Sequence, residues 1–347
     1  YPFVPSKAFN ELITRIEKIR VQKDSSAIIV QGPQGSGKSA TRNGIKDTFA
    51  KKPNTVVIQT SLSSLDIRDL AWSIIDNAKD QGFVDDAFLT KIEYEEGKDI
   101  EKPKLEKIIV KVLEEVVSKN ELCILIIDEF DVISQPTFHD TNDQTLFLHN
   151  ITNVLNLINE SEIIERKPIC TILAQTADSS ADFKKYISDR HAPLASRIKG
   201  DIDIKYDYDE TKEIILQRFE REAVSAFTKP DGNELFPLDD QIIKFLFEQI
   251  NNLTQTTGQM INFRVMEQIL HDAIQESLEQ NLPKVELNVV EKIYNEYKSD
   301  IQSKTGSKIK LSPETRNEID KAIGGEDQNT ANCLYLNGIR TAMTMWE

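Results

Sequence analysis

The 347-residue chain has few cysteines, no long apolar run and no surplus of basic residues. Its three cysteines are an odd number, and Cys123 and Cys170 lie in apolar, strand-like segments without metal-ligand spacing, so a disulfide framework and a zinc site are both unexpected. No run approaches the roughly 20 apolar residues that cross a bilayer, and the N-terminus lacks the pattern of a secretory leader. These absences predict an intracellular protein without a membrane partner, nuclear if eukaryotic and cytoplasmic if prokaryotic.

The net charge and the histidine content argue against two further kinds of function, general nucleic-acid binding and metal binding by histidines. A formal net charge of −15 opposes general attraction to nucleic acid, and no run of interleaved basic and aromatic residues is present. The four histidines do not pair at the spacing of metal ligands: His139, His149, His191 and His271. With 39% hydrophobic and 29% charged residues, the composition is that of a globular protein.

The most informative segment is Gly32-Pro-Gln-Gly-Ser-Gly-Lys-Ser39, a full match to the phosphate-binding loop G-x-x-x-x-G-K-[ST]. Residues 27–31 before it, apolar up to Val30, predict a buried strand, and residues 39–49 after it have helical spacing. Glycines let backbone N–H groups turn inward around phosphate oxygens, and the start of the helix adds its positive end. A nucleoside triphosphate is therefore the expected ligand, and ATP is our specific prediction.

Each position of the loop has an expected role. Lys38 would reach the β- and γ-phosphates as a point charge, and the Ser39 hydroxyl would be a ligand of Mg²⁺. The segment expected to enclose the nucleotide consists of Gly32, Pro33, Gln34, Gly35, Ser36, Gly37, Lys38, Ser39 and Ala40.

Two acids follow the most apolar strand-like run of the chain, residues 122–127. Asp128 is expected to hold Mg²⁺, mainly through water, and Glu129 to polarise the attacking water as a general base. Many strands end in acidic residues at the protein surface. Here a phosphate-binding loop occurs upstream, and its bound Mg²⁺ needs an acidic ligand, so we expect Asp128 and Glu129 to be functional. Lys38 and Glu129 are thus predicted catalytic residues.

Strand-like and helical segments alternate up to residue 208, which predicts an α/β fold with a parallel sheet covered on both faces. The acidic stretch from Asp80 to Lys102 is interpreted as a solvated excursion, and residues 202–206 as a short last strand. After residue 208 only helical stripes follow, which predicts a small helical domain. Because the chain does not begin with Met, we expect it to be trimmed from a longer protein. The predicted organisation is an N-terminal linker helix (1–22), a nucleotide-binding α/β domain (23–208), a helical lid (209–298) and a polar C-terminal segment (299–347) that starts a further domain.

Further site residues are assigned by position alone. Thr176 at the end of the strand 169–174 could orient the attacking water, with Gln175 as the second candidate. Arg197, just before the last strand, could act as a finger on the nucleotide of a neighbouring subunit, with Arg190 as its competitor. Arg264, early in a helix of the lid, could contact the bound nucleotide.

Together these parts resemble the AAA+ ATPases over about residues 3–298. Within them, Ile126-Ile-Asp-Glu-Phe-Asp131 and Asp143-Gln-Thr-Leu-Phe-Leu-His149 are similar to the replication-initiator branch, the origin recognition complex subunits and their archaeal relatives. Residues 206–218 resemble the passage from sheet to lid in that branch. The resemblance implies a P-loop NTPase domain with a helical lid, ATP and Mg²⁺ as ligands, other AAA+ subunits as partners in a homo- or hetero-oligomer, and contact with DNA.

Three functions remain open at this point. The first is an ATP-hydrolysing switch that assembles with other subunits in DNA replication initiation or a related DNA transaction. The second is the ATPase core of a defence or transposition regulator with the same fold, including its STAND-like form. The third is a P-loop kinase, in which an acid such as Glu129 would activate a substrate hydroxyl; the helical lid and the position of Ser196-Arg197 argue against it.

Overall fold

The structure is a computed structural model that describes residues 5–32, 35–94, 100–134, 141–176, 183–222, 235–257 and 263–306. The chain divides into two compact units, Tyr1–Tyr294 and Asn295–Glu347. The fold described below lies in the first unit, apart from the end of its last helix. Within the described segments, no helix is long and apolar enough to cross a membrane.

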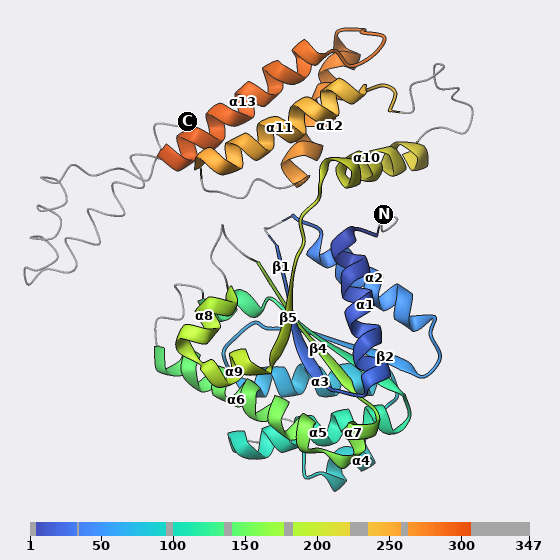
Figure 1. Cartoon of the computed structure of the whole chain (residues 1–347), viewed down its shortest axis with the longest axis vertical. Helices are drawn as coiled ribbons and strands as arrows, with labels where there is room; N and C mark the ends of the chain where they lie inside the picture. Colours follow the sequence, from blue (N-terminus) through green and yellow to red (C-terminus); the bar gives the residue numbers. More distant parts are fainter. Residues whose placement is uncertain are drawn as a thin grey trace, which may run out of the picture. The chain divides into compact units, whose positions relative to one another are not determined.

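A five-stranded parallel sheet forms the centre of the first unit (Figure 1). The strands are β1 (Ser26–Gly32), β2 (Thr55–Ser61), β3 (Leu122–Asp128), β4 (Ile169–Thr176) and β5 (Ile198–Asp203). Their order in the sheet is β2-β3-β4-β1-β5, so the connections that leave the neighbouring strands β1 and β4 run in opposite directions across the sheet. The predicted parallel α/β sheet is confirmed. The predicted last strand was misplaced, since β5 begins at Ile198 rather than at Ile202.

Helices connect the strands and cover both faces of the sheet (Figure 1). They are α1 (Lys7–Gln22), α2 (Lys38–Ala50), α3 (Ile67–Asp80), α4 (Asp86–Lys91), α5 (Lys102–Ser118), α6 (Thr141–Glu160), α7 (Glu162–Arg166), α8 (Phe183–Arg190) and α9 (Ala192–Arg197), with a 3-10 turn, η1 (Phe130–Ser134), after β3. The start of α1 is fixed by Ser6, whose hydroxyl accepts the Phe9 N–H at 3.1 Å. Such a cap satisfies a backbone donor that the helix itself leaves open.

Successive side chains of the central strands belong to two separate hydrophobic cores. Ile124 and Ile126 of β3 pack in one core with α1 and α2, while Leu125 and Ile127 pack in the other with α3, α5 and α6. This alternation follows from the two-residue period of a strand and explains why the run 122–127 is apolar throughout. Cys123 and Cys170 are buried free thiols in these cores, and burial raises the pKa of Cys123 to about 12. They are reduced core residues, as the sequence predicted; Cys333 lies outside the described residues.

The acidic stretch between Asp80 and Lys102 is not simply a solvated excursion. Four of its side chains belong to the same core as α3 and α5: Val84, Leu89, Ile92 and Tyr94. The prediction was wrong because these apolar residues are few and widely spaced among charged ones that face solvent. A short helix, α4, is enough to turn Leu89 inward.

Four helices follow the sheet: α10 (Tyr208–Glu222), α11 (Asp240–Thr257), α12 (Phe263–Glu279) and α13 (Leu287–Gly306). Their existence was predicted, although α13 extends well past residue 298, where a polar linker was expected. The apolar stripe of α12 is buried through Met266, Ile269 and Leu270. The role of these helices as a lid, and the domain boundaries given above, stay predictions.

Candidate active site

The phosphate-binding loop lies at the carboxyl edge of the sheet, between the end of β1 and the start of α2. Gly37 is the N-terminal cap of α2, with a φ of 90°, and no side chain caps this end of the helix. The first N–H groups of a helix have no acceptor within it, so the start of α2 can present donors to an anion. Pro33 and Gln34 lie outside the described residues.

Two glycines of the loop are required by close packing. A Cβ on Gly32 would lie 2.4 Å from Ser36 Oγ and 3.1 Å from the Ile204 carbonyl oxygen. A Cβ on Gly37 would lie 2.1 Å from the Tyr206 hydroxyl, and the positive φ disfavours any side chain there. The Tyr206 ring also contacts the ring of Phe263 at the start of α12, with 5.9 Å between their centroids.

The polar groups of the loop fit a phosphate. The Lys38 ammonium donates to the carbonyl oxygen of Gly32 at 2.7 Å, which holds the charge across the loop. Ser36 Oγ is buried and has no hydrogen-bond partner among the described residues, although buried hydroxyls are normally paired. An oxyanion held in the loop would supply the missing partner. Ser39 and Ala40 are exposed at the start of α2 and accessible to a ligand.

Asp128 and Glu129 lie at the same edge of the sheet, at the end of β3. Glu129 has a φ of 55°, and its Oε2 accepts the Ser61 hydroxyl at 3.1 Å. Ser61 is brought there by strand register, since it pairs with Asp128 at the end of β2. Asp128 Oδ1 accepts the Glu129 N–H at 3.0 Å, and Asp128 Oδ2 forms an ion pair with Arg42 of α2. Hydroxyl and carboxylate oxygens are the ligands that Mg²⁺ prefers, so Ser39 and Asp128 are chemically suited to hold it.

The end of β4 lies between these two sets of residues. Thr176 is the last residue of β4 and pairs with Gly32, at the point where the phosphate loop begins. Gln175 is buried and donates from Nε2 to Gln31 Oε1 at 3.0 Å, and Gln31 in turn donates to Asp203 of β5. The Gln175 Oε1, by contrast, is buried without a hydrogen-bond partner among the described residues, so Thr176 and Gln175 both stay candidates for orienting the attacking water.

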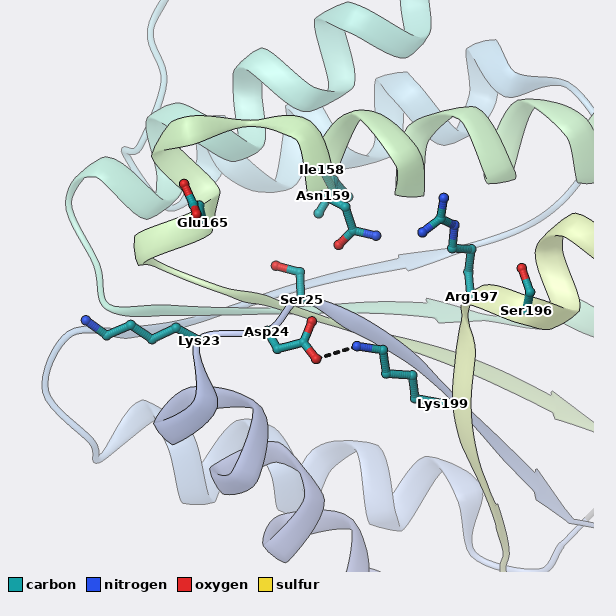
Figure 2. A pocket seen from close by; sticks show the side chains of 9 residues that line it. All are labelled: Lys23, Asp24, Ser25, Ile158, Asn159, Glu165, Ser196, Arg197 and Lys199. Atoms are coloured by element: carbon teal, nitrogen blue, oxygen red, sulfur yellow. Dashed lines mark hydrogen bonds and ion pairs between the residues drawn. The ribbon is translucent and has the colours of Figure 1, made fainter.

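Arg197 lies at the opposite edge of the sheet, because it directly precedes β5 and all five strands run in the same direction. It lines a cavity of about 320 Å³ together with residues from α6, Glu165 of α7 and the segment that precedes β1 (Figure 2). The guanidinium points toward Asn159 in that view, whereas Lys199 is paired with Asp24. Arg190 is placed differently: its guanidinium lies 3.9 Å from the centroid of the Tyr186 ring. Neither arginine joins the phosphate loop within one chain.

Arg264 is exposed as the second residue of α12. Its neighbour Phe263 touches Tyr206, so the start of this helix is linked to Gly37 through two aromatic rings. The role of Arg264 toward a nucleotide stays a prediction.

The structure brings together two histidines that are far apart in the sequence. The rings of His149 and His191 lie 6.0 Å apart, centroid to centroid, and His191 is the N-terminal cap of α9. Desolvation, and then the nearby His149, lower the pKa of His191. In the part of the chain that the structure describes, no group of three or more metal-ligating side chains is found. His191 is buried, whereas His149 is exposed, so the two rings meet at the boundary between the core and the surface.

Sequence reasoning missed three side chains that the fold brings to the loop and to the carboxylates: Arg42, Ser61 and Tyr206. Arg42 follows Lys38 by one helical turn, and this spacing alone could have drawn attention to it. Ser61 and Tyr206 give no local signal, since their positions depend on strand order and on the path of the chain after β5.

The chain is similar to known proteins in its fold but only slightly in its sequence. No family model matches the chain, and no curated protein matches it. Among solved structures, the ORC2 protein of Aeropyrum pernix in its ADP form is 16% identical, with 84% of this chain and 67% of that chain covered and a TM-score of 0.54. Cdc6p of Pyrobaculum aerophilum is 12% identical, with 85% and 69% covered and a TM-score of 0.51. The chain therefore has the AAA+ fold in the form found in the ORC2 and Cdc6 proteins.

Proposed function

We propose that the chain binds ATP with Mg²⁺ at the carboxyl edge of its sheet and hydrolyses it. The observation that carries this proposal is the meeting of the phosphate loop, Asp128-Glu129 and Thr176 at the ends of three neighbouring strands. Ligands of open parallel sheets bind at this edge, where the order of the strands reverses. The solved ORC2 structure in its ADP form lends support, because it combines the same fold with a bound nucleotide.

Each residue has a distinct role in this proposal. Lys38 and the backbone from Gly32 to Ala40 hold and orient the phosphates, and Ser36 gains the hydrogen bond that it otherwise lacks. Mg²⁺, held by Ser39 and Asp128, would neutralise charge on the phosphates. Glu129 accepts a proton from the attacking water, with its carboxylate positioned by Ser61.

Hydrolysis is proposed to serve assembly rather than metabolism. Arg197 stands away from the loop of its own chain and unpaired among the described residues, so it can approach the nucleotide of a neighbour as a finger. Arg264 is proposed to contact the nucleotide from the helical segment. The partners would be other AAA+ subunits, and the setting DNA replication initiation or a related DNA transaction. Contact with DNA is part of the proposal through the ORC2 and Cdc6 likeness.

Two variants separate binding from turnover. Lys38→Ala should abolish ATP binding, because the loop loses its only positive side chain. Glu129→Gln should retain ATP binding and lower turnover by about 100-fold or more, the usual effect of losing a general base. Binding is read by calorimetry and turnover by phosphate release. Normal hydrolysis by Glu129→Gln would refute the assignment of the base.

A dilution series distinguishes the switch from a kinase. Turnover per chain should fall on dilution if a neighbouring subunit completes the site. A kinase would keep its rate as a dilute monomer when an acceptor is supplied.

A further inference from the structure

The ion pair between Arg42 and Asp128 occupies the carboxylate that is expected to hold Mg²⁺. Arg42 lies on α2, one turn after Lys38, and Asp128 is the last residue of β3. Both side chains are largely shielded from water, with 22% and 16% of their surfaces exposed. An ion pair this sheltered interacts more strongly than one on the open surface.

The pair is incompletely satisfied. Arg42 contacts Asp128 through Nη1 only, and its Nε–H is buried without a hydrogen-bond partner among the described residues. Asp128 is more fully engaged, because its second oxygen accepts the Glu129 N–H at 3.0 Å. A guanidinium that served only to brace the fold would be expected to pair in a forked arrangement through two N–H groups. Because Arg42 contacts Asp128 through one N–H group, separating the two breaks fewer hydrogen bonds than separating a forked pair would.

We propose that Arg42 is a positioning residue that holds Asp128 in the nucleotide-free protein and is displaced when Mg²⁺ arrives with the nucleotide. The inference rests on the proposed binding of ATP and Mg²⁺. A guanidinium on Asp128 Oδ2 and a hydrated Mg²⁺ beside the same carboxylate would repel each other, so the binding of one disfavours the other. Arg42 thus competes with Mg²⁺ and sets the Mg²⁺ concentration at which the site fills.

The test is the Mg²⁺ dependence of nucleotide affinity in the full chain. ADP binding is measured by calorimetry in EDTA and across a Mg²⁺ titration, for the unaltered protein and for Arg42→Gln. Glutamine removes the charge and keeps a polar, though shorter, side chain. We expect half-maximal Mg²⁺ enhancement of ADP affinity at about a tenfold lower Mg²⁺ concentration in Arg42→Gln, which corresponds to about 1.4 kcal/mol. ADP affinity in EDTA should change little.

Arg20→Gln is the matched control. Arg20 is similarly shielded, with 27% of its side chain exposed, and pairs at 3.1 Å with Glu121 just before β3 begins. The Arg20→Gln substitution therefore removes an arginine–carboxylate ion pair at the other end of β3. Its Mg²⁺ dependence should equal that of the unaltered protein. Arg42→Lys keeps the full charge on a shorter, more flexible side chain and should fall between the two, which preserves the test if Arg42→Gln folds poorly.

Three results would overturn the inference, each in a different way. An unchanged Mg²⁺ dependence in Arg42→Gln and Arg42→Lys, with a lowered melting temperature, would make the pair a structural brace. A large loss of ADP affinity in EDTA would make Arg42 a phosphate ligand instead. Absence of ADP binding in every protein, including the unaltered one, would refute the proposed function itself.

Discussion

Glu106 of α5 is a buried carboxyl group, with only 6% of its surface exposed. Asn153 Nδ2 donates to its Oε1 at 3.2 Å. Burial raises the pKa of Glu106 above the ordinary value for a carboxyl, because the charged form is poorly solvated there, while the Asn153 hydrogen bond and nearby His149 oppose the shift. The folded protein therefore holds this proton more tightly than the unfolded chain does.

The sign of this shift predicts a stabilising substitution. As pH rises through the ordinary carboxyl value of 4.5, the unfolded chain loses the proton first, so Glu106 increasingly destabilises the folded state. Glu106→Gln keeps an oxygen for Asn153 and has no charge to bury. It should raise the free energy of unfolding by about 1 kcal/mol at pH 7 and by nothing at pH 4. Urea unfolding at both pH values measures this.

An exposed glutamate provides the comparison for Glu106. The pKa of Glu121 is lowered by its hydrogen bond to Arg20, so Glu121→Gln should leave stability at pH 7 unchanged or slightly reduced. If Glu106→Gln were less stable at pH 7, the charged Glu106 carboxylate would stabilise the folded protein overall, and the cost of burying its charge would not decide the free energy of unfolding.

The short helix α9, which ends in Arg197, begins at a histidine that can form two mutually exclusive hydrogen bonds. His191 Nδ1 accepts the Leu194 N–H at 3.2 Å as the N-terminal cap. Thr152 Oγ1 lies 3.3 Å from the same nitrogen, but its own proton is donated to the Leu148 carbonyl oxygen at 2.8 Å. Neutral Nδ1 therefore caps α9, whereas a protonated Nδ1 can only donate to Thr152 of α6.

This arrangement predicts acid sensitivity of α9. Burial and His149 lower the pKa of His191 in the folded state. Neutral His191 therefore contributes its full stabilisation of the folded state above the ordinary pKa of 6.5, and this stabilisation is lost as the pH falls through the lowered pKa of the folded protein. His191→Asn keeps a capping acceptor that does not titrate, and its stability should fall less between pH 7.5 and 5.5. His191→Leu should lose about 1 kcal/mol already at pH 7.5. Thermal unfolding at the two pH values measures both, and equal acid sensitivity of His191→Asn would contradict this role.

The elements predicted from sequence were those with a strong local period. The stripe of α1 and the apolar run of β3 were readable because each repeats the geometry of its own element. The start of β5 was missed because only alternate residues of this edge strand are buried, so no apolar run marks it. Leu89 and Ile92 were assigned to solvent since their burial depends on α3 and α5, which local sequence cannot show.

The same limit applies to the site. Lys38, Asp128 and Glu129 could be proposed from sequence because the loop motif and the acids after a buried strand carry their own signal. Ser61 reaches Glu129 only because β2 and β3 are neighbours in a fixed register, a pairing that no local pattern specifies.

At the scale of the whole chain, the phosphate loop and the Arg197 cavity lie at opposite edges of one parallel sheet. The cavity contains positive charge from Lys23, Arg197 and Lys199, of which Lys199 is paired with Asp24. Among the described residues, Arg197 has no hydrogen bond or ion pair, so it can receive negative charge from another molecule. In the proposed function this molecule is a second subunit.

Arg197→Ala should therefore affect only the assembled protein. At concentrations where chains associate, ATP turnover should fall by at least tenfold, while ADP affinity and the rate of the dilute protein stay unchanged. Arg190→Ala, which removes a cation from the Tyr186 ring instead, is the paired variant and should retain turnover. Phosphate release measured beside sedimentation separates activity from association. Loss of activity in Arg190→Ala alone would move the finger to that residue.

The phosphate loop and Arg197 lie at opposite edges of the sheet, so each chain has two different surfaces for contact with neighbouring chains. If one chain's arginine meets the next chain's loop, every junction uses two different surfaces, and the same junction can be repeated without limit unless the turn per subunit closes a ring. An open assembly would then have unlike ends: a terminal chain whose nucleotide no arginine reaches, and at the other end an arginine with nothing to act upon. Growth and disassembly would start from chemically different places.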